Sequence, residues 1–289
     1  MQATDDLDAQ VTHGYVDHDG VKIHYASLGA GPLVVLIHGF PDYWETWRAQ
    51  MPALAAAGYR AVALDLRGYN LSDKPAEDAA YAMSVLIGDV VAVIHACGEE
   101  RATIIGHDWG GIIAWQLAMY VPSAVARLVV LSTPHPALLA RELATNAEMQ
   151  RRSQYAQDFQ EHGASPRLPW ETVLTGPWLK DSAARARHTA ALARSDRTAM
   201  LAYYRVNYPR PPYAISDTLS PKIAVSTLVI YGLGDSAFVP ESHEGTWRYV
   251  ERDTTVCMLP GVGHFVQAEA ADFVSNTVLG WLATHRDTP

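Results

Sequence analysis

Short apolar runs alternate with helical patterns along most of the chain. The pattern opens with a hairpin, in which a turn at Asp19-Gly20 joins strands at 15–18 and 21–25. The next predicted strands are 33–37, 60–66, 102–105 and 128–132, separated by predicted helices at 44–57, 84–97 and 110–120. Because these strands are apolar on both faces, we expect a parallel sheet covered by helices on both sides.

The alternation stops near residue 135 and resumes near residue 219. The residues between these points are polar, have helical periodicity and contain no core strand pattern. Beyond them the pattern predicts strands at 227–231 and 254–259 and helices at 241–250 and 268–284. The sequence therefore predicts an α/β fold with a doubly wound, mostly parallel sheet. Residues 1–134 and 219–289 would form the core, and residues 135–218 an inserted all-helical cap.

Composition narrows the functional classes. A chain of 289 residues with 49% hydrophobic residues is long enough to bury one large core. Its net charge of −9 argues against nucleic acid or an anionic membrane as partner. The acidic amino terminus carries no signal-peptide pattern, and the apolar run at 33–37 is far too short to span a bilayer. We expect a cytoplasmic protein, either a monomer or a homodimer, with a small-molecule partner.

Two absences shape the chemistry. The two cysteines, Cys97 and Cys257, lie in separate apolar runs, so we expect buried thiols in a reducing compartment rather than a disulfide. The sequence has no zinc-binding His-Glu-x-x-His, no Cys-x-x-Cys, no Walker motif and no dinucleotide-binding glycine pattern. No metal or organic cofactor is therefore expected.

The chemistry centres on residues 106–111, Gly-His-Asp-Trp-Gly-Gly. They have the spacing of a nucleophile elbow, with Asp108 where Ser is usual, between a predicted strand and a predicted helix. Backbone N–H groups and the helix dipole at that point favour a charged carboxylate, which needs no base to activate it. Taken alone, the same residues also describe an Asp that caps a helix between turn glycines.

Two further side chains complete a catalytic set. Asp235 lies just beyond the strand at 227–231, and His264 follows the last strand. In open α/β sheets, sites form at the carboxyl ends of strands, so these loops and the elbow converge. The chain order of nucleophile, acid and histidine is that of α/β hydrolases. Either residue alone would be an ordinary loop residue.

The loop after strand 33–37 supplies a candidate oxyanion hole. It reads His38-Gly39-Phe40-Pro41, and the backbone N–H of Phe40 can point at the same place as that of Trp109. The Phe40-Pro41 bond is also a candidate cis peptide, since tight functional turns tolerate X–Pro in cis.

The chain resembles the α/β-hydrolase-fold epoxide hydrolases, which are related to haloalkane and haloacetate dehalogenases. The resemblance runs from about residue 19 to residue 282 and is carried by residues 38–44, 65–69 with 72–75, 106–111 and 261–269. It implies an α/β-hydrolase fold and an aspartate nucleophile. It also implies two cap tyrosines that bind and protonate the epoxide oxygen. Tyr204 matches the second of these motifs and Tyr155 the first; the adjacent Tyr203 competes with Tyr204.

The resulting hypothesis is an epoxide hydrolase that forms a vicinal diol through an aspartyl ester. Asp108, Asp235, His264, Tyr155 and Tyr204 would be catalytic, with water as second substrate. Phe40, Trp109 and His135 are the expected substrate-binding residues. The alternatives are a haloalkane or haloacetate dehalogenase that uses the same aspartate, and a non-catalytic small-molecule receptor, which would not need the complete set of Asp108, Asp235 and His264.

Overall fold

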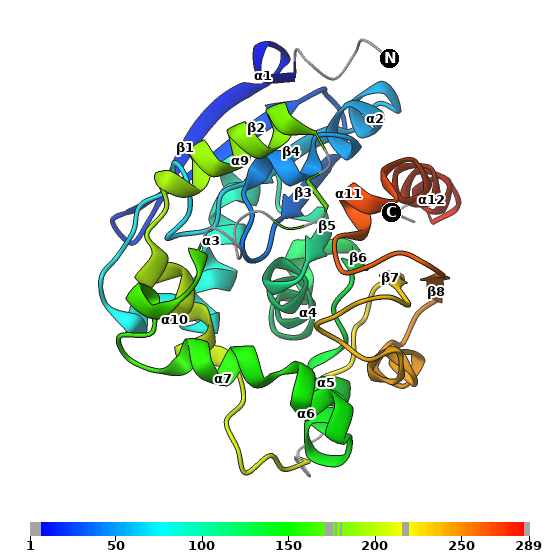
Figure 1. Ribbon diagram of the computed structural model, residues 1–289. Coiled ribbons are helices and arrows are strands. Elements are labelled where there is room, and N and C mark those ends of the chain that lie inside the picture. Colours follow the sequence, from blue (N-terminus) through cyan, green and yellow to red (C-terminus); the bar gives the residue numbers. More distant parts are fainter. Residues whose placement is uncertain (1–6, 171–175, 177, 180, 216–219, 286–289) are drawn as a thin grey trace.

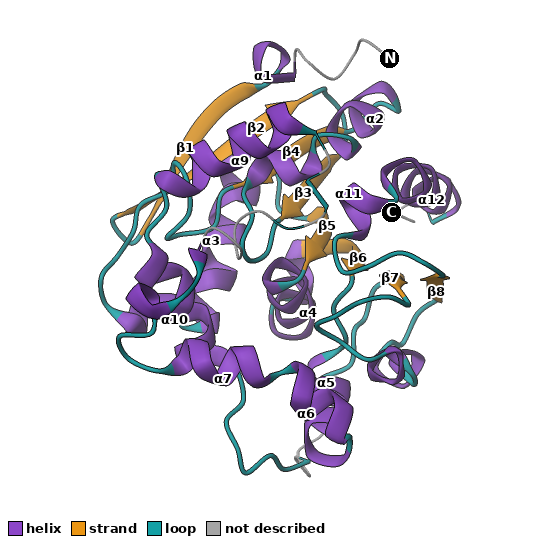
Figure 2. Ribbon diagram, in the orientation of Figure 1, coloured by secondary structure: helices purple, strands orange, loops and turns teal. Residues whose placement is uncertain are grey.

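A mixed sheet forms the centre of the molecule (Figures 1 and 2). The structure, a computed structural model, describes residues 7–170, 176, 178–179, 181–215 and 220–285. Within them the sheet has eight strands in the order β1-β2-β4-β3-β5-β6-β7-β8. The strands are β1 Thr12–His18, β2 Val21–Leu28, β3 Leu33–Ile37, β4 Arg60–Leu64, β5 Ala102–His107, β6 Val125–Leu131, β7 Thr227–Gly232 and β8 Thr254–Leu259. The hairpin strands β1 and β2 are antiparallel and the other six are parallel, which confirms the predicted sheet.

Helices cover both faces of this sheet. Alternate side chains of β3 enter two separate cores: Val35 and Ile37 join the one under α3 (Met83–Ala96) and α4 (Trp109–Tyr120). Val34 and Leu36 join the core under α2 (Gln50–Ala56) and α12 (Ala271–Thr284). Figure 1 shows these helix pairs on opposite sides of the strands. Because side chains of a strand alternate in direction, apolar residues at every position bury both faces, and the doubly wound arrangement is confirmed.

Three helices that the sequence predicts as continuous are each divided into two shorter elements, so these predictions are wrong. Residues 44–57 form a 3₁₀ turn, Trp44–Trp47, followed by α2, because Pro52 has no N–H to continue a helix from Arg48. Residues 241–250 form two 3₁₀ turns, Pro240–His243 and Thr246–Tyr249, separated by Gly245 with a left-handed φ of 94°. Residues 268–284 form α11 (Val266–Glu269) and α12, which break at Ala270.

All described elements between β6 and β7 are helical, as expected (Figure 2). These inserted helices are α5 Pro136–Thr145, α6 Ala147–Arg152, α7 Gln154–Gln160, α9 Ser182–Ala193 and α10 Arg197–Asn207, with a 3₁₀ turn at Ser165–Arg167. Asn146, Asp181 and Asp196 each accept hydrogen bonds from the first amides of their helices, which sets where α6, α9 and α10 begin. The second predicted cap boundary, at 218/219, lies outside the described residues.

The remaining described elements are short. They are α1 Leu7–Gln10 and the 3₁₀ turns Asp78–Tyr81 and Pro122–Ala124. None of the helices in the described ranges combines the length and apolarity needed to cross a bilayer. The described His, Cys, Asp and Glu side chains form no cluster suited to a metal ion. Cys97 and Cys257 are free thiols, but both are half-buried rather than buried as predicted.

Candidate active site

A strained turn at Asp108 joins β5 to α4. Asp108 has a φ of 51° and a ψ of −120°, a conformation that residues with side chains rarely adopt. Glycines permit the close packing around it. A Cβ on Gly106 would lie 2.2 Å from the Gly110 carbonyl oxygen, and a Cβ on Gly110 would lie 2.0 Å from the Ile37 carbonyl oxygen. The backbone therefore has the strand–turn–helix geometry that the glycine spacing predicts.

The Asp108 carboxylate is buried between a backbone amide and a histidine ring. The Phe40 N–H donates to Oδ1 at 2.7 Å, and His264 Nε2 lies 3.5 Å from Oδ2. Burial raises the pKa of Asp108, but the hydrogen bond and charge of His264, together with the Phe40 amide, outweigh burial and lower it overall. Asp108 is therefore an anion at neutral pH, the form that a carboxylate nucleophile requires.

The loop that carries Phe40 approaches Asp108 closely. A Cβ on Gly39 would lie 2.4 Å from Asp108 Oδ1, so only glycine fits there. The Phe40-Pro41 peptide is cis, as predicted. Trp109 is the first residue of α4, where backbone N–H groups have no partner within the helix. The Phe40 amide thus binds the Asp108 side chain. The Trp109 amide belongs to the residue that directly follows Asp108 in the chain.

His264 links Asp108 to Asp235. Its Nδ1 donates to Asp235 Oδ2 at 2.8 Å, and the other Asp235 oxygen accepts from the Ala237 and Phe238 amides at 2.7 and 3.1 Å. Burial lowers the pKa of His264, but the two flanking carboxylates outweigh burial and raise it to about 10. The histidine is therefore a cation at neutral pH, with one N–H directed at each carboxylate. The three loops converge at the carboxyl ends of the strands as predicted.

A carboxylate that the sequence prediction did not assign holds the His264 loop. Glu269 accepts from the Gly263 amide at 2.9 Å and from the Phe265 amide at 3.0 Å, on either side of His264. His107 donates from Nε2 to the His264 carbonyl oxygen at 3.0 Å. The available signal was an acidic residue at the start of a helix, where carboxylates bind free backbone amides.

Two tyrosines from the inserted helices stand over Asp108. Tyr204, on α10, packs edge-on against Trp109 and Phe40 at ring-centroid distances of 5.0 and 5.5 Å. Tyr155, on α7, packs edge-on against Tyr204 at a ring-centroid distance of 6.0 Å. Burial and nearby charges, including Asp108, raise the pKa of both tyrosines well above the usual value. Both hydroxyls are therefore neutral and able to donate a proton.

The competing tyrosine has a different position. The Tyr203 hydroxyl donates to the Arg67 carbonyl oxygen at 2.9 Å, and its ring packs against Tyr69 and Tyr81. Arg67 in turn forms two hydrogen bonds to Asp89, at 2.7 and 2.5 Å. Tyr203 therefore belongs to the core beneath α10, and the structure favours Tyr204 over it.

Buried polar contacts fix the two tyrosine-bearing helices to each other. Gln160, at the end of α7, donates to the Tyr204 and Tyr208 carbonyl oxygens at 3.1 and 2.7 Å. The Tyr208 hydroxyl donates to Ser153 Oγ, at the start of α7, at 2.9 Å. Both Gln160 and Tyr208 are residues that the sequence prediction missed, since their partners lie more than forty residues away.

His135 has different neighbours. Its Nδ1 accepts from the Ala137 amide at the start of α5, and its ring stacks on Tyr249 and meets Trp115 edge-on. Burial lowers the pKa of His135 to about 3, so the ring is neutral. These contacts account for His135 as a helix-capping and packing residue. Its expected role in substrate binding stays a prediction.

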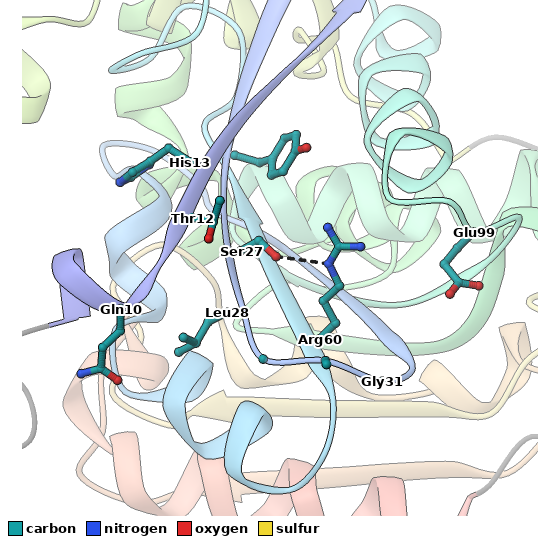
Figure 3. A pocket seen from close by; sticks show the side chains of 11 residues that line it. Gln10, Thr12, His13, Ser27, Leu28, Gly31, Arg60 and Glu99 are labelled. Atoms are coloured by element: carbon teal, nitrogen blue, oxygen red, sulfur yellow. Dashed lines mark hydrogen bonds between the residues drawn. The ribbon is translucent and has the colours of Figure 1, made fainter.

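A cavity of about 550 Å³ lies at the opposite end of the sheet (Figure 3). Its lining includes Gly31 just before β3, Arg60 at the start of β4 and Glu99 just before β5. In Figure 3 Arg60 reaches Ser27, to which its Nε donates at 3.2 Å. This cavity lies at the amino ends of the parallel strands, away from the ends at which Asp108, Asp235 and His264 meet.

Known proteins provide an independent comparison. The family model described as alpha/beta hydrolase fold matches residues 32–271. Epoxide hydrolase 4 of Mus musculus is 30% identical, over 96% of this chain and 81% of that protein. The crystal structure of a mutant epoxide hydrolase from Bacillus megaterium is 30% identical with a TM-score of 0.86, over 93% of this chain and 100% of that chain. A structure of epoxide hydrolases from metagenomes of hot environments is 32% identical with a TM-score of 0.83, over 95% of this chain and 99% of that chain. The chain belongs to the epoxide hydrolases of the α/β-hydrolase fold.

Proposed function

We propose that this epoxide hydrolase forms a vicinal diol through a covalent ester on Asp108. In the first step an Asp108 oxygen attacks an epoxide carbon from the side opposite the ring oxygen, and the carbon–oxygen bond of the ring breaks. The ring oxygen takes a proton from the hydroxyl pair of Tyr155 and Tyr204. The product of this step is a hydroxyalkyl ester. The tyrosine recovers its proton through solvent from the His264 imidazolium.

The second step hydrolyses the ester. Neutral His264, oriented by Asp235, takes a proton from water, and the hydroxide adds to the Asp108 carbonyl carbon. The Phe40 and Trp109 amides stabilise the oxyanion. The intermediate then expels the diol oxygen, which takes the proton of the new carboxyl group. This sequence restores the Asp108 carboxylate and the His264 cation, with epoxide and water consumed and diol released.

Electrostatics supports the change in the role of His264. Its raised pKa depends on two carboxylates, Asp235 and Asp108. Esterification removes the negative charge of Asp108, so the pKa of His264 falls as soon as the intermediate forms. The same side chain is therefore a cation beside the nucleophile and a base beside the ester.

The position of Tyr155 and Tyr204 is the observation that carries this proposal: their rings pack against each other, and Tyr204 packs on Phe40 and Trp109, the two residues that flank the Asp108 carboxylate. An epoxide oxygen leaves carbon as an alkoxide, a poor leaving group unless it gains a proton. Halide leaves without a proton. A paired hydroxyl donor beside the nucleophile therefore favours an epoxide over a carbon–halogen bond.

Removal of the tyrosine hydroxyls tests the assignment. We expect Y155F/Y204F to lose styrene oxide hydrolysis by about 100-fold or more, the range typical of general acid catalysis. Y203F is the matched control and should stay within about twofold, because its hydroxyl donates to a backbone carbonyl in the core. Diol formation and bromide release from 1-bromobutane are measured side by side. Unchanged diol formation in Y155F/Y204F, or bromide release without diol formation in the wild type, would overturn the proposal.

The covalent step has its own readout. In H264Q the second step lacks its base, so intact-protein mass spectrometry should show the chain plus one styrene oxide. D108N should show no such addition. An unmodified H264Q chain, with an epoxide that the wild type consumes, contradicts the ester mechanism.

Two further proposals concern the domain organisation and the cellular location of the protein. Residues 135–218 would act as the cap, which is supported by their helical described elements and by the presence of both catalytic tyrosines among them. A cytoplasmic location is supported by the free thiols of Cys97 and Cys257, since thiols persist in reducing compartments. Cell fractionation tests the location, and recovery in an oxidising compartment would contradict it.

A further inference from the structure

One arginine of the inserted helices reaches the loop of the catalytic acid. Arg152 ends α6, and its Nη1 donates to the carbonyl oxygens of Asp235 and Phe238 at 2.5 and 2.9 Å. Its Nε donates to Glu148 Oε1 at 2.7 Å, one helical turn earlier. The Arg152 side chain is 23% exposed. Its guanidinium thus makes two hydrogen bonds to one loop while a carboxylate of its own helix holds it in place.

The two carbonyl groups belong to the turn that aims Asp235, the acid loop of residues 234–238. Within this turn Asp235 Oδ1 accepts from the Ala237 and Phe238 amides, while Oδ2 accepts from His264. Arg152 holds the backbone at the first and the last residue of the hydrogen-bonded turn. A shift of this turn would therefore move the carboxylate that orients His264.

The chain directly after Arg152 leads to the proton donor. Ser153 accepts from the Tyr208 hydroxyl, and Tyr155 follows two residues later. Four consecutive residues therefore join the acid loop, the hydroxyl of Tyr208 and Tyr155, one of the two proposed proton donors. The Arg152 contact holds the start of this segment against the acid loop.

One side of the junction is open. A cavity of about 470 Å³ borders it, and its lining includes Arg152, Tyr155, Gly234, Asp235 and Ser236. Because open space adjoins this side of the contact, the directional hydrogen bonds of Arg152 connect the acid loop to α6 where side-chain packing does not. The guanidinium of Arg152 is charged, and hydrogen bonds from a charged donor are stronger than those between neutral groups.

We propose that Arg152 is a positioning residue. It couples the acid loop to the tyrosine-bearing segment and so keeps Asp235, His264 and Tyr155 in fixed positions relative to one another. It touches neither substrate nor the reacting atoms. The proposal rests on the proposed function for its kinetic consequences, but the hydrogen bond between His264 and Asp235 is observable without turnover.

The test compares R152M with R152K and two controls. R151M removes a neighbouring arginine that also pairs with Glu148 but is 73% exposed. R141M removes a second contact between the inserted helices and the core, in which Arg141 donates to the Glu241 and Glu244 carbonyl oxygens. R152K retains a charged donor that can reach the acid loop.

Two measurements are made on each variant. In single turnover with styrene oxide, R152M should slow ester hydrolysis by about 10- to 100-fold, the effect of a misplaced catalytic group. R152K should recover most of this loss, and R151M should stay within about twofold, as expected for an exposed ion pair. In proton NMR, the low-field resonance of the His264 Nδ1 proton should shift or disappear in R152M and persist in R151M and R141M.

The outcomes separate the two proposals. An unchanged resonance in folded R152M, with hydrolysis within about twofold of the wild type, overturns the role of Arg152 and leaves the ester mechanism intact. Equal losses in R152M and R141M would show that general docking of the helices is what matters, which also overturns it. A wild type without an ester refutes the proposed function, while the NMR result still decides the role of Arg152. If R152M does not fold, R152K and R152Q carry the same comparison.

Discussion

Asp108 is ionised where burial alone would keep a carboxyl group protonated. The opposing influence is His264, whose cation lies 3.5 Å from one Asp108 oxygen and whose other nitrogen is held by Asp235. The arrangement is a chain of alternating charges, and its middle member depends on both ends. Any reaction that neutralises Asp108 therefore changes the protonation of His264, which links the two steps of the proposed mechanism.

The pKa of His264 gives a prediction at this scale. In the free enzyme we expect NMR of the labelled histidine to show protonation up to a pH near 10. In single turnover, the rate of ester hydrolysis should rise with pH along a titration that lies below the one of the free enzyme, because the ester no longer carries the charge of Asp108. A free-enzyme titration near 6.5, the ordinary value for histidine, would contradict the assignment.

At the scale of elements, the site depends on how closely strand, turn and helix approach. The elbow brings α4 against the end of β3, so Gly110 lies where any side chain would collide with the Ile37 carbonyl oxygen. The inserted helices meet in a different way, through Gln160 and Tyr208, whose hydrogen bonds join α7 to α10. Backbone proximity thus places Asp108, the proposed nucleophile, while side-chain hydrogen bonds join the helices that carry Tyr155 and Tyr204, the proposed proton donors.

A pair of glycine substitutions tests the first of these points. G110A should destabilise the protein by more than about 3 kcal/mol or prevent folding, because the added Cβ would lie 2.0 Å from a backbone oxygen that cannot move freely. G280A in α12 is the matched control, since its Cβ would meet no atom within 4 Å. It should stabilise the helix by about 0.5–1 kcal/mol. Urea unfolding measures both, and equal stability of the two variants would contradict the packing argument.

At the scale of the whole molecule, buried histidines make stability depend on pH in both directions. Burial lowers the pKa values of His107, His135 and His243 to about 3, while His264 is raised to about 10. Below their unfolded pKa near 6.5, the first three take up protons only when the chain unfolds, so acid favours unfolding. His264 has the opposite effect, because its stabilising contribution is complete below pH 6.5 and is lost as the pH rises toward 10.

Unfolding experiments across pH should therefore find the greatest stability near neutrality. Toward pH 4, each of the three lowered histidines contributes a loss of about 1.4 kcal/mol per pH unit once its unfolded form is protonated. Toward pH 10 the wild type should lose stability while H264Q stays flatter. A wild-type free energy of unfolding that is constant between pH 4 and 10 would contradict these pKa directions.

The sequence alone determined the features that depend on local periodicity and on motif spacing. The apolar strands, the helices between them, the glycine elbow and the cis Phe40-Pro41 loop follow from residues close together in the chain. The order of Asp108, Asp235 and His264 was sufficient to predict convergence, because strands of a parallel sheet bring their carboxyl ends to one edge. The continuity of helices was harder to predict from the sequence, since Pro52 and Gly245 each interrupt a helix at a single turn.

Only the tertiary structure decided which polar side chains meet. Tyr203 and Tyr204 are neighbours in sequence, but they point about 100° apart around α10, one into the core and one over Asp108. Glu269 and Arg152 hold the loops of His264 and Asp235 through backbone amides and carbonyls, groups that every residue possesses. The sequence can mark Glu269 as an acidic residue in the first turn of a helix, but it does not show which backbone groups either side chain binds, because this depends on where the fold brings distant segments.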